Sequence, residues 1–494
     1  MTRPTLQNDR CFRVIDCTTS APLPPQSSVA PPDAPVLCAP ELAADMAEIL
    51  AVSLLADMPF DRHADPHATV HLAPEARFTV HELLCQMRTV PWCDAAVLAG
   101  EAGSGGDLQA QQRRRLRWND DRQLTLGTLL RCGVALPVGQ AGLSALFDCD
   151  HAVSDIEGPL PAPSEAAPLS VWVRWCARHS GAALGLPGNG SAPVVLDTPA
   201  RMAAHVLAAP AARLFHGVTL SALANAAPVD EGLRAPEGAE TPWTGARLFA
   251  LLAEAERRAR RAALTRLAAT DRAARPAVTG ARMTVYLAQE ERSAAPVSAP
   301  YREAADDLAA AAPDLLHWAG SANALSRGRR RFDRSLFLPL GRCDTPIYPS
   351  DAAAHLIVAG ALATLIKAVF NTSQPRRLQL VGSVDTGMDL GLELDKAVAN
   401  FAMARVISGG YFPAENHQDM RFGQSIALQL LRETLEADNR PASLSLRDFD
   451  GRSLQLVAQA RSIGRGHAAL RAGAEWLGWP DFSKRPEVHL TAVV

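Results

Sequence analysis

The stretch that most constrains this chain is the run DTPIYPSDAAAHLIVAGALATLIKAVF at residues 344–370. It opens with a tight polar turn at Tyr348-Pro349-Ser350 and then continues as an apolar helix without interruption. A Pro-Ser turn at the start of a helix, with a histidine nearby, is one way in which proteins hold a phosphate-like anion. Such a site also needs cationic side chains, so the rest of the sequence decides whether an anion is bound.

The remaining sequence predicts many further helices. The chain has 494 residues, enough to bury a large core, and its alanine- and leucine-rich composition favours helix. Residues 442–458 instead alternate apolar and polar side chains around Asp450-Gly451, which is typical of a hairpin. We therefore predict an all-α fold, a large helical bundle with a small C-terminal β-hairpin. The predicted helices cover roughly residues 40–58, 79–88, 122–132, 200–215, 244–268, 353–370, 391–408 and 418–437.

The N-terminal part of the chain differs from the rest. Residues 18–40 are too rich in Pro and Ser for regular structure, so residues 1–39 are predicted to form an extended arm. Residues 40–494 then form one helical domain. Its first helix ends at Pro59 and carries one apolar face, formed by Leu42, Met46, Ile49, Leu50 and Leu54.

The charge of the chain argues against a nucleic-acid partner, because the net charge is −3. Only three of the 49 basic residues are lysines: Lys367, Lys396 and Lys484. No lysine upstream of residue 367 can therefore bind a phosphate or form a Schiff base. The arginine-rich segment at residues 244–269 is interpreted as the solvated face of an amphipathic helix.

The cysteines and the N-terminus predict a cytoplasmic protein. The nine cysteines are scattered, without a C-x-x-C pair or metal-ligand spacing, as expected of reduced thiols. The N-terminus lacks an apolar signal core, and no apolar run is long enough to span a membrane. We expect no membrane partner and no metal site.

Three segments resemble the vanadium-dependent haloperoxidases, in particular their bromoperoxidase-like branch. They are residues 31–63, 337–370 and 392–431, and the resemblance extends over roughly residues 30–460. This family shares its fold with the phosphatidic acid phosphatase type 2 superfamily. The resemblance implies a helical bundle, often assembled as an oligomer. It also implies an anion site in which a lysine, two arginines and a backbone nest hold vanadate, while two histidines act as metal ligand and as acid or base.

The first family motif, a lysine followed by Arg-Pro, has no counterpart here. Residues 315–335 contain His317 and a group of arginines, and lysine is excluded. The spacing does not choose which arginine replaces the lysine among Arg327, Arg329, Arg330, Arg331 and Arg334.

The second motif, Pro-Ser-Gly-His, can be aligned in two ways. Aligned from Ser350, the Gly-His pair becomes Asp351-Ala352, which places a carboxylate where an anion should bind. Aligned backward from the helix, His355 takes the position of the acid–base histidine, with extra residues before it. We prefer the second alignment, because the apolar helix fixes the directions of its side chains.

The third motif, Arg-x5-His-x3-Asp, aligns without a gap. Arg405 matches the family arginine, Tyr411 stands where the vanadium-bonding histidine is expected, and Glu415 stands in place of the aspartate. A phenol must lose a proton before it can bond a metal, whereas a neutral imidazole need not. His417 is close in sequence but would reach the site only if the turn were reshaped. The resemblance therefore implies that vanadate is not bound and that the chain has no cofactor.

We predict a repurposed enzyme of specialised metabolism that works without vanadate on a small-molecule substrate. A tyrosine, a histidine, a carboxylate and an arginine suffice for proton transfer in a rearrangement, cyclisation or dehydration. The predicted catalytic residues are His355, Tyr411, Arg405, Glu415 and Asp351, with Ser350, His417 and His317 as substrate contacts.

Two alternatives remain open. One is a non-catalytic partner of an intact haloperoxidase paralogue, since the family assembles through its helices. The other is residual haloperoxidase or phosphatase activity. The expected assembly is a homo-oligomer, or a hetero-oligomer with a paralogue.

Overall fold

The computed structural model describes most of the chain, in ranges separated by gaps. These are residues 31–73, 76–93, 108–119, 121–137, 142–147, 195–224, 227, 229–234, 243–267, 274–288, 297–327, 335–338, 354–372, 377–378 and 388–479. Two predicted site residues, Ser350 and Asp351, lie outside the described residues, as do residues 1–30 of the predicted arm.

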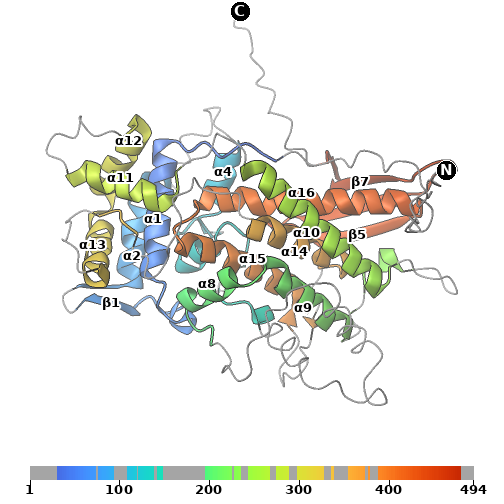
Figure 1. Cartoon of the computed structure of the whole chain (residues 1–494), viewed down its shortest axis with the longest axis horizontal. Helices are drawn as coiled ribbons and strands as arrows, with labels where there is room; N and C mark the ends of the chain where they lie inside the picture. Colours follow the sequence, from blue (N-terminus) through green and yellow to red (C-terminus); the bar gives the residue numbers. More distant parts are fainter. Residues whose placement is uncertain are drawn as a thin grey trace, which may run out of the picture.

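Helices dominate the described chain, which confirms the predicted fold class (Figure 1). The α-helices are α1 (Ala39–Leu54), α2 (Val80–Arg88), α4 (Leu108–Arg115), α5 (Leu126–Leu130), α8 (Pro199–Ala208), α9 (Ala211–Ala224), α10 (Gly245–Leu267), α11 (Pro276–Ala288), α12 (Ala299–Ala311), α13 (Pro313–Arg327), α14 (Ala354–Val369), α15 (Leu390–Ile407) and α16 (Pro413–Asp438). Short 3-10 helices lie at Phe60–Arg62, Pro91–Cys93, Ala145–Phe147 and Glu231–Leu233.

The predicted helix at residues 200–215 is two helices, α8 and α9, which meet at an angle of 94°. The break falls at Ala209-Pro210, where proline has no amide hydrogen to donate to a continuing helix. Four further helices, α4, α11, α12 and α13, lie in segments where the sequence pattern predicted none. Among the described residues no single helix is both long and apolar enough to cross a membrane, and the bent pair α8–α9 meets that test only as a pair.

The predicted C-terminal hairpin forms part of a larger sheet. Strands β5 (Ala442–Arg447) and β6 (Ser453–Gln459) pair across the expected turn, where Gly451 adopts a positive φ of 82°. Two further antiparallel strands, β7 (His467–Ala472) and β8 (Glu475–Leu477), extend the sheet in the order β5-β6-β7-β8. Shorter antiparallel pairs join β1 (Thr69–Ala73) to β2 (Ala76–Thr79) and β3 (Arg377–Leu378) to β4 (Met388–Asp389).

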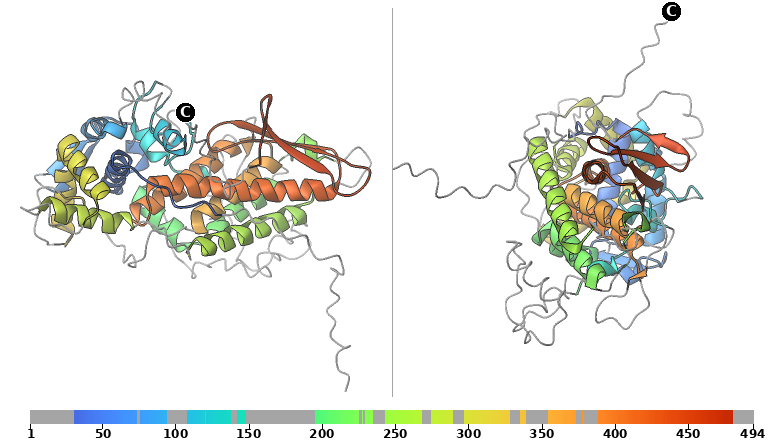
Figure 2. Two further views of the ribbon diagram at one scale, coloured as in Figure 1. Left: turned by 90° about the horizontal axis from the view of Figure 1, so that it is seen from above. Right: turned by 90° about the vertical axis from the view of Figure 1, so that its right-hand side faces the viewer.

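The apolar helix α14 lies at the centre of the molecule. Helices α9, α10, α15 and α16 pack around it, and nearly all of its residues are buried. Helix α16 lies between the C-terminal sheet and α10 (Figure 2). Helices α1, α2, α11, α12 and α13 form the end of the molecule opposite the C-terminal sheet (Figure 1). Helix α14 is apolar on all sides, so it requires neighbouring helices to enclose it.

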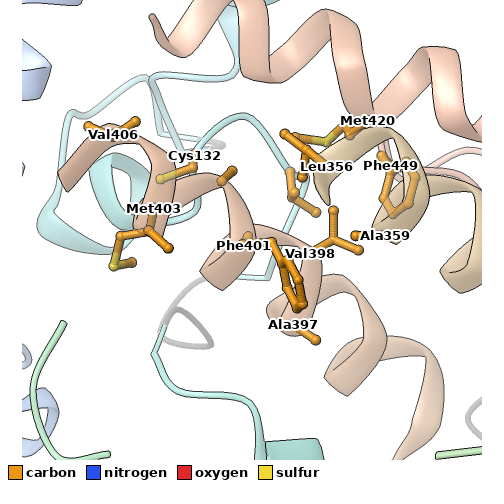
Figure 3. Packing of buried hydrophobic residues seen from close by; sticks show 14 of the residues in the cluster. Cys132, Leu356, Ala359, Ala397, Val398, Phe401, Met403, Val406, Met420 and Phe449 are labelled. Atoms are coloured by element: carbon orange, nitrogen blue, oxygen red, sulfur yellow. The ribbon is translucent and has the colours of Figure 1, made fainter. Parts of the chain in front are cut away.

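Helices α14 and α16 cross at close range in the core. There Leu356 and Ala359 of α14 lie near Met420 of α16 (Figure 3). A methyl group on Gly423 would lie 2.2 Å from the carbonyl oxygen of Ile357, so only glycine allows the two backbones to approach this closely.

We expect Gly423→Ala to lower the free energy of unfolding by about 1–3 kcal/mol, because overpacking outweighs the better helix propensity of alanine. Urea denaturation measures the difference. Gly478→Ala is the matched control, since an added methyl group there meets nothing within 4 Å. Equal stability of the two variants would contradict the close crossing.

Candidate functional site

The candidate site is built around the turn between α15 and α16. Helix α15 ends at Ile407, and Ser408 closes it by donating from Oγ to the carbonyl of Arg405 at 2.7 Å. Gly409 then adopts a positive φ of 66°, which lets the chain reverse direction. Pro413 starts α16. The turn therefore places Arg405 and Tyr411 a few residues apart, on either side of the reversal.

The guanidinium group of Arg405 is buried and paired. Its Nη2 donates to Oδ2 of Asp419 at 3.1 Å, and Nη1 of Arg266 donates to Oδ1 of the same carboxylate at 2.6 Å. All three side chains are at most 3% exposed. The Tyr411 ring covers one face of the guanidinium, with its centroid 3.7 Å from Cζ of Arg405. A buried guanidinium requires such compensation, because removing it from water is costly.

The structure thus pairs Arg405 with Asp419, a residue that the sequence analysis did not name. Glu415 and Asp351 were the two candidate partners predicted for Arg405, and Asp351 lies outside the described residues. Glu415 lies buried at the start of α16, where Oε2 accepts a hydrogen bond from the backbone of Phe412 at 3.1 Å. The signal for Asp419 was present in its spacing, since it follows Glu415 by four residues on the same helix.

The burial of Arg266 corrects the interpretation of the arginine-rich segment at residues 244–269 as a solvated helix face. Two other arginines of α10, Arg257 and Arg260, are about half exposed and pair with glutamates of their own helix, as that interpretation predicts. Arg266, at the C-terminal end of α10, is instead buried against α16. Periodicity alone could not distinguish them, because Asp419 is 153 positions away in sequence.

His355 lies on the first turn of α14, half-buried. Its ring forms a hydrogen bond with the backbone of Ala209 at the break between α8 and α9. Burial, and next the positive charge of Arg405, lower the pKa of His355, and the hydrogen bond to Ala209 opposes them. The imidazole is therefore neutral at neutral pH, and Arg405 is close enough to influence both His355 and Tyr411.

The structure does not bring His417 or His317 to Arg405. His417 is buried on α16 but lines a small cavity with residues of α1 and α4. Burial, and then the charges of Arg421 and Arg113, hold its pKa well below the ordinary value. His317 is exposed on α13, which packs against α1 and α2. His417 and His317 were predicted as substrate contacts from sequence proximity and from alignment. Neither kind of evidence gives the direction of a side chain.

The described part of the site therefore combines three chemical groups. Arg405 and Arg266 share the single carboxylate of Asp419, which leaves one net positive charge among these three residues. A neutral imidazole and a phenol flank that charge. This set can accept a proton, donate a proton and stabilise a developing oxyanion.

Comparison with known proteins places this geometry in context. No family model matches the chain. Vanadium-dependent bromoperoxidases of Corallina pilulifera and Corallina officinalis are each 26% identical to it over 137 residues. The match covers 25% of this chain and only 23% of the length of each relative.

The fold extends much further than the sequence match. A solved structure of the second vanadate-dependent bromoperoxidase from Ascophyllum nodosum, described as homohexameric, matches with a TM-score of 0.57 at 15% identity. The structural match covers 90% of this chain and 75% of the bromoperoxidase chain. By its fold, and by its sequence over the matched segment, the chain is vanadium-haloperoxidase-like.

Proposed function

We propose that this protein is an enzyme that works without vanadate and catalyses proton transfer in a small organic molecule of specialised metabolism. The observation that carries the proposal is the sharing of Asp419 by Arg405 and Arg266, with Tyr411 stacked on Arg405. The protein's own carboxylate and aromatic ring take up much of the cationic surface that a bound oxyanion would use.

The charges support the absence of vanadate. An oxyanion is bound by cations that nothing else neutralises, and here Asp419 already compensates one of the two described arginines. At an effective dielectric constant of about 20, one compensated charge about 4 Å away weakens binding by roughly 4 kcal/mol. Tyr411 also presents a phenol where the resemblance calls for an imidazole.

Each group has a role in the proposed chemistry. His355, neutral because its pKa is lowered, accepts a proton from a carbon or oxygen of the substrate. Tyr411 donates one from its hydroxyl. Arg405, held rigidly by Asp419, stabilises the negative charge that develops on a substrate oxygen. A rearrangement, a cyclisation or a dehydration requires only such steps.

The first test is an assay for the family's reaction. We expect the purified protein not to brominate monochlorodimedone in the presence of peroxide, bromide and orthovanadate, because Asp419 already compensates one of the two described arginine charges. The rate is compared with that of heat-denatured protein. Turnover that depends on added vanadate would refute the proposal.

The second test concerns His355 directly. Deuterium incorporation from D₂O into a panel of cyclic β-keto esters reports proton abstraction without knowledge of the natural substrate. We expect His355→Asn to slow the exchange by about 10²–10⁴-fold. His317→Asn, an exposed histidine on α13, is the matched control and should leave the rate unchanged.

The pH profile adds a signature of His355. Since burial and Arg405 lower its pKa, the base form persists below the ordinary value of 6.5. The acid limb of the exchange rate should therefore lie below pH 6.5 and vanish in His355→Asn. An acid limb above pH 6.5 would contradict this assignment.

A second candidate function is a subunit of a larger assembly, either with copies of this chain or with an intact paralogue. It is favoured by the homohexameric form of the structural relative. Light scattering after size-exclusion chromatography, with the chain alone and with a co-expressed paralogue, distinguishes a homo-oligomer, a hetero-oligomer and a monomer. A monomer under both conditions would exclude this candidate.

A further inference from the structure

A second polar cluster, distinct from the candidate site, joins α1, α4 and α16. Glu41, Asp45 and Glu48 lie on one face of α1, spaced by about one helical turn. Their side chains are at most 8% exposed. Three carboxylates on one buried helix face require cationic partners from elsewhere in the chain.

Two arginines supply those partners. Arg113 of α4 binds Glu41 in a bidentate manner, through Nε at 2.7 Å and Nη2 at 3.0 Å. Arg117, just beyond α4, donates from Nη2 to Asp45 and from Nε to Glu48, the latter at 3.2 Å. The second oxygen of Asp45 accepts from the backbone of Ala414 at 3.2 Å, in the first turn of α16. The cluster thus ties three segments together.

A small cavity lies within this cluster. Its volume is about 20 Å³, and Asp45, Glu48, Arg117, Thr128 and His417 are among the residues that line it. Two buried polar atoms on its wall, Nη1 of Arg117 and Nε2 of His417, have no hydrogen-bond partner among the described residues. The residues that carry them are only 8% and 6% exposed. Leaving such atoms unpaired would be costly.

We propose that this cavity is a binding site for one water molecule, hydrogen-bonded to both Arg117 Nη1 and His417 Nε2. The volume suits water, which needs roughly 10–15 Å³, and excludes an oxyanion or an organic ligand. The polarity also suits it. Arg117 is a donor, which disfavours a cation, and the carboxylate of Asp45 disfavours an anion. Water is neutral and can donate and accept, so it serves either tautomer of His417.

The water completes a polar connection between α1 and the beginning of α16. Asp45 holds the backbone at Ala414 directly, and the water holds His417 one turn later. The start of α16 is therefore anchored at two successive points by the same cluster.

A crystal structure of the full chain, at a resolution that shows ordered solvent, tests the proposal. The expected result is a density peak in the cavity at about 2.7–3.2 Å from both Arg117 Nη1 and His417 Nε2. Crystals soaked in sodium bromide should show no anomalous peak there. An empty cavity in the native protein, or a bromide peak inside it, would overturn the assignment to water.

Two variants of His417 extend the test. His417→Gln keeps a polar group on the cavity wall and should retain the water. His417→Leu removes this polar group. The density for the water should then be lost, and the equilibrium constant for unfolding should rise about tenfold. Water retained in His417→Leu in an unchanged position would show that Nε2 is not a partner. If His417→Leu does not fold, the native crystal and His417→Gln still decide the question.

Discussion

Replacing Asp419 with asparagine is expected to lower the free energy of unfolding by about 3–5 kcal/mol, because two buried guanidinium groups lose the carboxylate that neutralises them. Arg405 and Arg266 both donate to Asp419, and each is at most 3% exposed. Urea denaturation measures the change. The matched control is Asp197→Asn, whose partner Arg201 is 60% exposed, so the loss there should stay within about 1 kcal/mol.

The same Asp419→Asn variant should gain affinity for anions. With Asp419 uncharged, a phosphate or vanadate ion beside Arg405 gains about 4 kcal/mol, or roughly a thousandfold in affinity. Phosphate should therefore raise the thermal stability of Asp419→Asn in a concentration-dependent manner and affect the native protein much less. Calorimetric titration gives the two dissociation constants. Tight phosphate binding by the native protein would show that Asp419 does not block the anion, and the proposed function would fall.

The second large effect is the pH dependence of stability caused by Glu48. Burial raises its pKa to about 7, against the attraction of Arg117, while Asp45 adds repulsion. The folded protein therefore keeps a proton that the unfolded chain releases between pH 4.5 and 7. The stability contributed by Glu48 is fully present below pH 4.5 and is lost as the pH rises through 7. Each pKa unit corresponds to about 1.4 kcal/mol, so the loss amounts to about 3 kcal/mol.

Glu48→Gln cannot ionise and should remove this loss. We expect the variant to match the native protein near pH 4.5 and to exceed its free energy of unfolding by about 3 kcal/mol at pH 8. Denaturation across the pH range gives the difference between the two proteins. The neighbouring groups Glu41, Asp45, Arg113, Arg117 and His417 are present in both proteins, so the comparison reports the change at Glu48.

Glu82→Gln provides a control of opposite sign. Glu82 caps the exposed start of α2, and hydrogen bonds from Thr79 lower its pKa. Its contribution to stability is present above pH 4.5 and is lost as the pH falls, so its difference curve should slope the other way. A flat difference curve for Glu48→Gln would show that Glu48 is ionised in the folded protein at pH 4.5 and above.

The sequence by itself determined the local elements, where short-range physics decides. The uninterrupted apolar run of α14 could only be a buried helix, and the structure encloses it on every side. The alternation around Asp450-Gly451 predicted the hairpin, because glycine readily adopts the positive φ that the turn needs. The helix was predicted to begin at residue 418, but α16 begins five residues earlier, at Pro413. Proline is favoured at the first position of a helix, and the apolar periodicity used for the prediction does not include this signal.

Alignment named Arg405, Tyr411 and His355 as site residues. The structure places the Tyr411 ring on the guanidinium of Arg405 and brings His355 within range of its charge. His417 lies away from this group, because closeness in sequence does not fix the side of a helix on which a residue lies. It faces α1 and α4 instead.

Only the tertiary structure decided which charges are buried and what neutralises them. The apolar pattern of α1 predicted one buried face, yet its acidic face is buried as well, because Arg113 arrives from 72 positions away to pair with Glu41. In the same way Arg266 reaches Asp419 across 153 positions. A charged side chain reads as solvated in any local pattern. It can be buried only where packing brings a partner of opposite charge to it, and that partner is set by the fold rather than by the neighbouring sequence.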